Sequence, residues 1–124
     1  MSISVKQIRK AKPVSANNLT RQIIALITAK GGFATRVNSQ GQWDPVRKVM
    51  RKGTTVKGMT DIVGVLNGVP LFIEVKVGKD KLRPEQEAVA EKIKKAGGKW
   101  ILARSLDDVI FEMPPVMRGF FLPL

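Results

Sequence analysis

Asp61, Glu74 and Lys76 are charged residues in two stretches that otherwise read as buried strands, 61–66 and 69–77. Burying a charge is costly unless another group pairs with it. Two carboxylates and an amine are also the groups that can hold a hard divalent cation and assist hydrolysis of a phosphodiester. Whether they do so depends on the fold bringing the three side chains together.

The dipeptide Asn67-Gly68 separates the two apolar runs, which is a strong signal for a β-hairpin with a two-residue type I′ turn. Pairing across that turn places Asp61 directly opposite Glu74, where Cβ atoms lie about 4.5–5.5 Å apart. Alternation along the strand places Lys76 on the same face as Glu74. Pro70 weakens one position of the ladder and could shift this register. The sequence therefore predicts one hairpin face that carries two carboxylates and an amine.

Like charges placed opposite each other destabilise a sheet, so this face needs an explanation. One explanation is structural, with Lys76 neutralising an acid or one acid staying protonated. The other is a divalent cation that bridges Asp61 and Glu74, with the backbone carbonyl of Val75 as a further ligand. Lys76 would then position or deprotonate a water, or stabilise charge on a phosphate. The residues alone leave both explanations open.

The sequence contains no Cys, no His and no Tyr. Disulfides, thiolate chemistry, the usual zinc sites, histidine triads and tyrosine nucleophiles are therefore excluded. Any catalysis has to use carboxylates, lysine, amides or hydroxyls. Any bound metal has to be a hard ion, which indicates Mg²⁺, with Mn²⁺ as a substitute.

The chain has 124 residues, which indicates one domain with its own core. Its apolar runs fall short of the roughly 18 residues that a membrane span needs. The N-terminus is basic and lacks the apolar segment of a secretory signal. We therefore expect a soluble cytoplasmic protein without a membrane partner.

Positive charge is concentrated in the first half of the chain. The formal net charge is +12, and residues 1–60 contain 12 Lys or Arg against one acid, Asp44. Such a surface favours nucleic acid as the partner. Trp43, in a polar stretch, could stack on bases or pack, whereas Trp100 is expected in the core. The candidate DNA contacts near the predicted hairpin are Arg36, Asn38, Arg47, Lys48, Arg51, Lys52 and Lys57.

Periodicity and turn signals give the order of the elements. We expect a helix at 17–30 capped by Asn17 or Asn18, a strand at 33–38, a loop at 40–44, a basic strand or extended arm at 45–52, strands at 61–66 and 69–77, a helix at 84–97, a strand at 100–103 and a helical turn from Ser105. The strands at 71–77 and 100–103 should run parallel, joined by a helical crossover. The predicted fold class is α/β, a mixed β-sheet flanked by helices.

These motifs resemble a known family. Gly58-x-x-Asp61, then Glu74-Val75-Lys76, then a helix carrying Gln86, resembles the PD-(D/E)XK nuclease core, and more closely its virus-type replication-repair nuclease (VRR-NUC) branch. The flanks agree, namely Arg36-Val37-Asn38-Ser39, Leu82-x-Pro84-x-Gln86 and Ala103-Arg104-Ser105. The resemblance implies a restriction-endonuclease-like core of order α-β-β-β-α-β over residues 17–113. A flexible basic arm (1–16) precedes it, and an apolar tail (114–124) follows.

The resemblance also implies roles for individual residues. Asp61, Glu74 and the carbonyl of Val75 would hold the metal, Lys76 would be the catalytic lysine, and Gln86 would be an active-site residue on its helix. An ordinary buried glutamine bonded to backbone is the alternative for Gln86. The family usually places a glutamate early in the first helix. This helix has no acid, and Asn17, Asn18 and Gln22 are the nearest substitutes, which bears on whether one metal or two can bind.

The function implied by the resemblance is a magnesium-dependent, structure-selective endodeoxyribonuclease that cuts branched DNA such as four-way junctions. No element looks like a major-groove reader, which agrees with recognition of backbone and shape. A homodimer with two related sites would suit two symmetric cuts, with the tail 114–124 either forming the dimer contact or packing on its own domain. The setting would be phage-type DNA repair or recombination in the cytoplasm of a bacterial host. The alternatives are a catalytically weak DNA-binding module and an RNA-binding protein.

Overall fold

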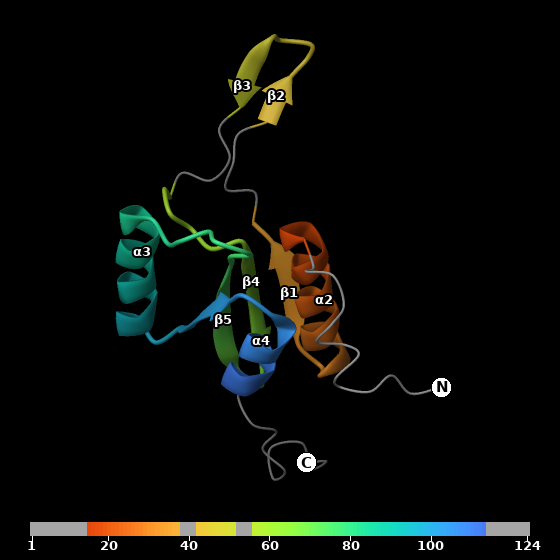
Figure 1. Cartoon of the computed structure of the whole chain (residues 1–124), viewed down its shortest axis with the longest axis vertical. Coiled ribbons are helices and arrows are strands. Elements are labelled where there is room, and N and C mark those ends of the chain that lie inside the picture. The colour runs from red at the N-terminus through yellow and green to blue at the C-terminus, as the bar shows by residue number, and fades with distance from the viewer. Residues whose placement is uncertain (1–14, 38–41, 52–55, 114–124) are drawn as a thin grey trace.

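The fold is built on a four-stranded mixed sheet, and the computed structural model describes residues 15–37, 42–51 and 56–113 (Figure 1). The sheet has the order β1-β4-β5-β6, with β5 and β6 parallel and the other neighbours antiparallel. Its strands are β1 (Phe33–Arg36), β4 (Ile62–Leu66), β5 (Val69–Val75) and β6 (Lys99–Ala103). The helices are α2 (Ala16–Ala29), α3 (Pro84–Lys95) and α4 (Leu106–Glu112). The predicted α/β class with a mixed sheet flanked by helices is confirmed.

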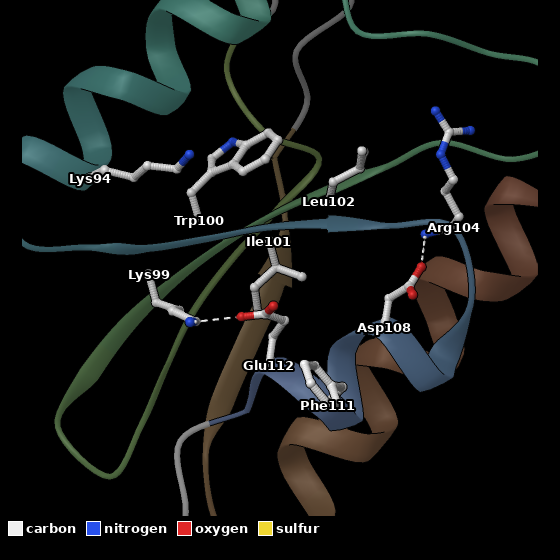
Figure 2. A pocket seen from close by; sticks show the side chains of 9 residues that line it. All are labelled: Lys94, Lys99, Trp100, Ile101, Leu102, Arg104, Asp108, Phe111 and Glu112. Carbon is white, nitrogen blue, oxygen red and sulfur yellow. Dashed lines mark hydrogen bonds and ion pairs between the residues drawn. The ribbon is translucent and has the colours of Figure 1, made fainter.

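Helices cover both faces of this sheet. On one face α2 and α4 bury the main core, and α3 covers the other face (Figure 1). Along β6, Ile101 points toward α4 while Trp100 points toward α3, as alternation requires (Figure 2). The core residues are Leu19, Ile23, Ile27, Ala34, Ile62, Leu66, Leu71, Ile73, Val75, Ile101, Ala103 and Val109. The α2 members of this set recur at helical spacing, which is why a single stripe of that helix packs on the sheet.

The turn between β4 and β5 has the predicted geometry. Asn67 (φ 53°) and Gly68 (φ 78°) both have positive φ, as a type I′ turn requires. Leu66 pairs with Val69, so the register is the one derived from the sequence. Pro70 does not disturb it, because Pro70 occupies a non-hydrogen-bonded position of the β4–β5 ladder and β6 pairs with β5 only from Leu71 onward. The hairpin thus holds its register without a bulge.

Several predicted boundaries need correction. Ser15, and not Asn17 or Asn18, caps α2, because its side chain accepts the backbone N–H of Asn18 (3.1 Å). The final helical turn is a longer helix, α4, for which Ser105 and Asp108 form a capping box. The predicted arm 1–16 lies outside the described residues except for its last two, and the tail 114–124 lies entirely outside them.

The prediction for residues 40–52 was wrong in part, since a strand (Val49–Arg51) lies within the predicted basic strand at 45–52 but residues 42–44, predicted as loop, form a strand as well. The expected loop and extended arm form a separate two-stranded sheet of β2 (Gln42–Asp44) and β3 (Val49–Arg51). β2 was missed, and the bounds of β3 were uncertain, because each strand is only three residues long and neither packs on the core. This hairpin projects beyond the edge of the main sheet (Figure 1). Among the described residues no helix combines the length and apolarity needed to cross a membrane.

Candidate active site

A cleft of about 630 Å³ lies at one end of the strands of the main sheet. Here β1 and β5 end, β4 begins, and α2 and α3 both start (Figure 1). The cleft is lined by Ala16, Asn17, Thr20, Arg36, Val37, Val56, Lys57, Gly58, Met59, Asp61, Glu74, Val75, Lys76, Asp80, Arg83, Glu85 and Gln86. All four residues predicted to be catalytic are in this set, together with Arg36 and Lys57 from the predicted DNA contacts.

Asp61 is fixed at the mouth of the β4–β5 hairpin. Ile62 pairs with Ile73, so Asp61 and Glu74 are the next positions outward in the same register. The backbone N–H of Val75 donates to Asp61 Oδ2 (2.8 Å), and the Asp61 carbonyl accepts from the N–H of Val37 (2.8 Å). Asp61 therefore ties the start of β4 to the ends of β5 and β1, and its carboxylate is oriented by backbone.

Glu74 is a buried acid, with 3% of its surface exposed. Its Oε1 accepts from Gln86 Nε2 (3.1 Å) and lies 4.0 Å from Lys76 Nζ. Its Oε2 is buried, and no donor group of another described residue reaches it. Burial, followed by the charge of Asp61 and a hydrogen bond with it, raises the pKa of Glu74 to about 8, against the opposing charges of Lys76 and Arg83. Without a bound cation, Glu74 therefore keeps its proton at neutral pH.

Of the two structural explanations for the acid pair, a protonated acid agrees with the raised pKa of Glu74, whereas neutralisation by Lys76 does not hold. Lys76 Nζ stands at the outer limit of an ion pair with Glu74, so it does not neutralise the two acids by itself. The Lys76 side chain is largely buried, and its backbone N–H donates to the Ala103 carbonyl (3.0 Å). Lys76 is consequently held beside the acid pair, with its ammonium group on the cleft.

Gln86 joins the first turn of α3 to the acid pair. Its Nε2 donates to Glu74 Oε1, and its Oε1 accepts the backbone N–H of Arg83 (2.9 Å), which closes the helix cap. Gln86 is buried, and both of its polar groups are used. The backbone-bonded alternative for this residue is observed, its amide also contacts the acid pair, and its active-site role stays a prediction. It thereby fixes the Glu74 carboxyl from the side of the helix.

Gly58 explains the Gly-x-x-Asp spacing. Its φ is +89°, and a Cβ at this position would overlap the backbone carbonyl of Glu85 and crowd the N–H of Gln86. Only glycine lets the segment before Asp61 lie directly against the start of α3. The glycine therefore sets the distance between the Asp61 segment and the helix that carries Gln86.

The donor set fits one hard cation. Asp61 and Glu74 supply carboxylates, and the Oε2 of buried Glu74, which no described donor reaches, is the kind of atom that a cation would satisfy. The N–H and C=O of one strand residue point to the same side, so the Val75 carbonyl faces the side on which its N–H meets Asp61. The described residues contain no group of three or more acidic, His or Cys side chains suited to a metal. The site suits an ion such as Mg²⁺, which keeps several waters.

The basic residues fall into two groups. Arg36 and Lys57 line the cleft, and Arg36 Nη2 donates to the side chain of Asn17 (2.5 Å). Arg47, Lys48 and Arg51 lie on the β2–β3 hairpin and are exposed. Asn38 and Lys52 lie outside the described residues. The structure therefore brings two of the seven predicted DNA contacts to the acid pair and places three on the projecting hairpin.

Arg83 was not among the predicted DNA contacts or site residues, and Asn17 was named only as a helix cap and as a substitute for the missing helix acid, yet both line the cleft. Arg83 precedes α3 and reaches the acid pair electrostatically, as its effect on Glu74 shows. Asn17 holds Arg36 through both its side chain and its carbonyl (3.2 Å). The position of Arg83 directly before the helix that carries Gln86 could have indicated from the sequence that Arg83 lies near the site. No sequence signal connects Asn17 with Arg36, because that contact joins two elements 19 residues apart.

A second hollow, between α3, β6 and α4, has a different character (Figure 2). Lys99 Nζ pairs with Glu112 (2.8 Å), Asp108 accepts the backbone N–H of Arg104 (2.8 Å), and Lys94 lies over the Trp100 ring at 5.3 Å. Its acids are each paired and partly exposed, so nothing there needs a cation. Trp100 is half-exposed in this hollow rather than buried in the main core, which corrects the expectation from the sequence.

Comparison with known proteins supports the fold. No protein-family model matches the sequence, and no curated protein matches it either. Among solved structures, a chain described as a VRR_NUC domain matches with a TM-score of 0.57 and 22% sequence identity, covering 77% of this chain and 94% of that chain. The resemblance drawn from the motifs is confirmed for the fold, which is that of a VRR_NUC, restriction-endonuclease-like domain. At this identity the likeness does not extend to chemistry, which has to be argued from the residues.

Proposed function

We propose that the chain is a metal-dependent nuclease of the PD-(D/E)XK type that hydrolyses phosphodiesters in branched DNA. The observation that carries the proposal is the buried Glu74 beside Asp61, with one oxygen that no described donor reaches and a pKa raised to about 8. Ionising Glu74 beside Asp61 is costly, and a divalent cation is what would offset the cost. A fold shared with a VRR_NUC domain supports the same conclusion.

The acid pair and the three residues that contact it each have a part in this function. A Mg²⁺ or Mn²⁺ ion held by Asp61, Glu74 and the Val75 carbonyl would supply an activated water and positive charge against the phosphate. Gln86 and the Val75 N–H keep the two carboxylates in place. Lys76 orients the attacking water or stabilises the charge that develops on the phosphate.

The basic residues bind the DNA strand on either side of the cut. Arg36 and Lys57 line the same cleft as the acid pair, so they contact phosphates next to the scissile one. Because such contacts read the backbone and not the bases, the enzyme selects DNA by its shape. Two copies with two related sites would make the paired cuts that a four-way junction needs, with the tail 114–124 as the dimer contact. The setting we propose is phage-type DNA repair or recombination in a bacterial cytoplasm.

The test is cleavage of labelled four-way junction, flap, duplex and single-stranded DNA with Mg²⁺, with Mn²⁺ and with EDTA. Glu74→Gln keeps the shape of Glu74 and the acceptor for Gln86 but removes the charge, and Lys76→Ala removes the amine. Glu112→Gln is the matched control, because Glu112 is a paired acid in the second hollow. We expect metal-dependent cutting of branched DNA that both cleft variants lose and the control keeps.

A catalytically weak DNA-binding module is the second candidate, favoured by the absence of an acid in the described first helix. It predicts DNA binding without cutting in either metal. That result would overturn the enzyme proposal while leaving the fold unchanged. Metal binding gives a readout apart from activity: since Glu74 is protonated at neutral pH, binding should release a proton, measured by calorimetry in buffers of different ionisation enthalpy.

A further inference from the structure

The β2–β3 hairpin has its own internal support. Asp44 Oδ1 accepts the backbone N–H groups of Val46 (2.9 Å) and Arg47 (3.1 Å), and Asp44 Oδ2 pairs with Arg51 Nε (3.1 Å). The Asp44 carbonyl also accepts the N–H of Lys48 (2.8 Å). A two-stranded hairpin is marginal on its own, and one aspartate here organises both its turn and its diagonal ion pair. The hairpin is therefore a defined arm and not an irregular loop.

One face of this arm is apolar and exposed. Trp43 pairs directly with Met50 across the strands, so their side chains lie on the same face. Trp43 is 57% exposed and Met50 is 63% exposed. Exposed apolar residues that are grouped in this way mark a binding surface. Asp44 and Arg51 lie on the other face together with exposed Val49, so their ion pair does not account for the exposure of Trp43 and Met50.

The charge around this face favours nucleic acid over a second protein. The arm holds three cations, Arg47, Lys48 and Arg51, against the single carboxylate of Asp44. Arg47 and Lys48 form no ion pair with any described residue, and both lie in the turn next to Val46. An aromatic ring flanked by unpaired cations is the combination that stacks a base and holds its phosphates. A contact between two copies would instead bring these cations together.

The arm is tethered close to the cleft. Its two roots, Val37 and Val56, both line the cleft that contains Asp61 and Glu74. Four residues separate each root from the arm, so the arm begins at most about 18 Å from the root even with the chain fully extended. Since neighbouring phosphates along a strand are about 3.4 Å apart along the axis, this reach covers about five nucleotides. In Figure 1 the arm projects beyond the end of the main sheet, and the residues that line the cleft lie at this same end.

We infer that the Trp43–Met50 face stacks on an unpaired or unstacked DNA base at a branch point, a few nucleotides from the strand held in the cleft. This inference rests on the proposed function and names the feature that distinguishes a branch from plain duplex. In intact duplex the bases are stacked on one another and cannot offer a face to Trp43. At a branch, a flap or a gap an exposed base can. The cleft binds the strand, and the arm recognises the interruption.

The experiment measures binding in EDTA, so that no strand is cut, to an intact duplex and to the same duplex carrying a flap or a short gap. Trp43→Ala should weaken binding to the interrupted DNA by roughly 5- to 150-fold, as loss of one stacked base predicts, and change binding to intact duplex by less than about twofold. Trp43→Phe should recover most of the loss. Phe111→Ala is the matched control, because Phe111 is an exposed aromatic residue on α4, in the second hollow.

Fluorescence gives a second readout. With Trp100→Phe as background, Trp43 is the sole tryptophan, and its emission should be quenched by interrupted DNA but not by intact duplex. Equal losses on both DNAs, or no loss on either, would overturn the inference. So would self-association that Trp43→Ala abolishes without any effect on DNA, since the face would then be a contact between copies.

The two proposals fail in different ways. If wild type cuts branched DNA and Trp43→Ala binds it equally well, the stacking inference is wrong and the nuclease proposal stands. If wild type prefers interrupted DNA through Trp43 but cuts nothing with Mg²⁺ or Mn²⁺, the nuclease proposal is wrong and the stacking face stands. Where both hold, cuts should cluster within about five nucleotides of the branch, and Trp43→Ala should spread them.

Discussion

The cleft and the β2–β3 arm depart from ordinary residue placement in opposite directions. The cleft buries charge, since Glu74 is almost inaccessible beside Asp61. The arm exposes apolar surface, since Trp43 and Met50 face solvent. Buried polar groups and grouped exposed apolar groups are the two informative departures in a folded chain. In this protein the two departures are neighbours along the chain, because Val37 and Val56, at the base of the arm, both line the cleft.

The difference between the regions is in how each is held. The cleft is held by the main sheet and by α3, through backbone bonds to Asp61 and a glutamine bond to Glu74. The arm is held by its own aspartate, Asp44, with no part in the main core. A site that performs chemistry needs rigid support. A site that adapts to varied DNA branches can be a tethered arm, and its loss should leave the fold intact.

The largest expected effect is a loss of cleavage when a carboxylate is removed from the cleft, compared with the same change on the arm. Asp61→Asn should lower metal-dependent cleavage by about 100- to 1,000-fold, because it removes one of the two carboxylates that we propose hold the metal ion. Asp44→Asn, the matched change on the arm, should lower it far less. The measurement is single-turnover cleavage of branched DNA. Similar losses for both variants would mean that the arm and the cleft form one catalytic unit.

The next effect concerns the packing that holds the cleft. Gly58→Ala should lower the free energy of unfolding by about 2–4 kcal/mol, because it adds both a strained positive φ and an overlap with the start of α3. Gly31 also has a positive φ (+90°) but has open space around it, so Gly31→Ala should cost only about 1 kcal/mol. Urea unfolding of both variants separates strain from overlap. Equal losses would show that the approach of Gly58 to α3 is unimportant.

The next prediction is a gain in stability that depends on pH. Because the folded-state pKa of Glu74 is raised from 4.5 to about 8, folding holds a proton that the unfolded chain loses, and stability falls as pH rises through this window. Glu74→Gln cannot ionise, so it should stabilise the metal-free protein by on the order of 2 kcal/mol at pH 6, by more as pH rises to 9, and change little at pH 4. Thermal unfolding across this range measures it. Glu112→Gln should show no such gain, and a Glu74→Gln variant less stable than wild type at pH 9 would contradict the burial argument.

The smallest effect is expected on the arm. Trp43→Ala should change the free energy of unfolding by no more than about 0.5 kcal/mol, because the side chain is exposed and lies outside the core. Chemical unfolding monitored by circular dichroism tests this, with Ile73→Ala as the contrasting core variant, expected to cost about 2–5 kcal/mol. A large loss for Trp43→Ala would show that the arm packs on the body and is not an independent element.

The sequence was most informative where local rules decide structure. The Asn67-Gly68 turn determined the register of β4 and β5, and with it the position of Asp61 opposite Glu74. Alternation placed Lys76 on the same face, and helical spacing brought Gln86 to the sheet. These are short-range consequences of turn geometry and periodicity, so they could be derived without knowing the rest of the fold.

Other features were decided only by tertiary structure. The charge state of Glu74 depends on how deeply α3 buries it, which no local pattern specifies. The support of Arg36 by Asn17 joins two elements distant in sequence, and the paired, exposed face of Trp43 and Met50 depends on a hairpin of two very short strands. Local sequence determines turn geometry and which face of a strand or helix a residue lies on, because these depend on the nearest residues. Burial, and contacts between distant elements, depend on the whole chain, and they determine which of these residues share a site.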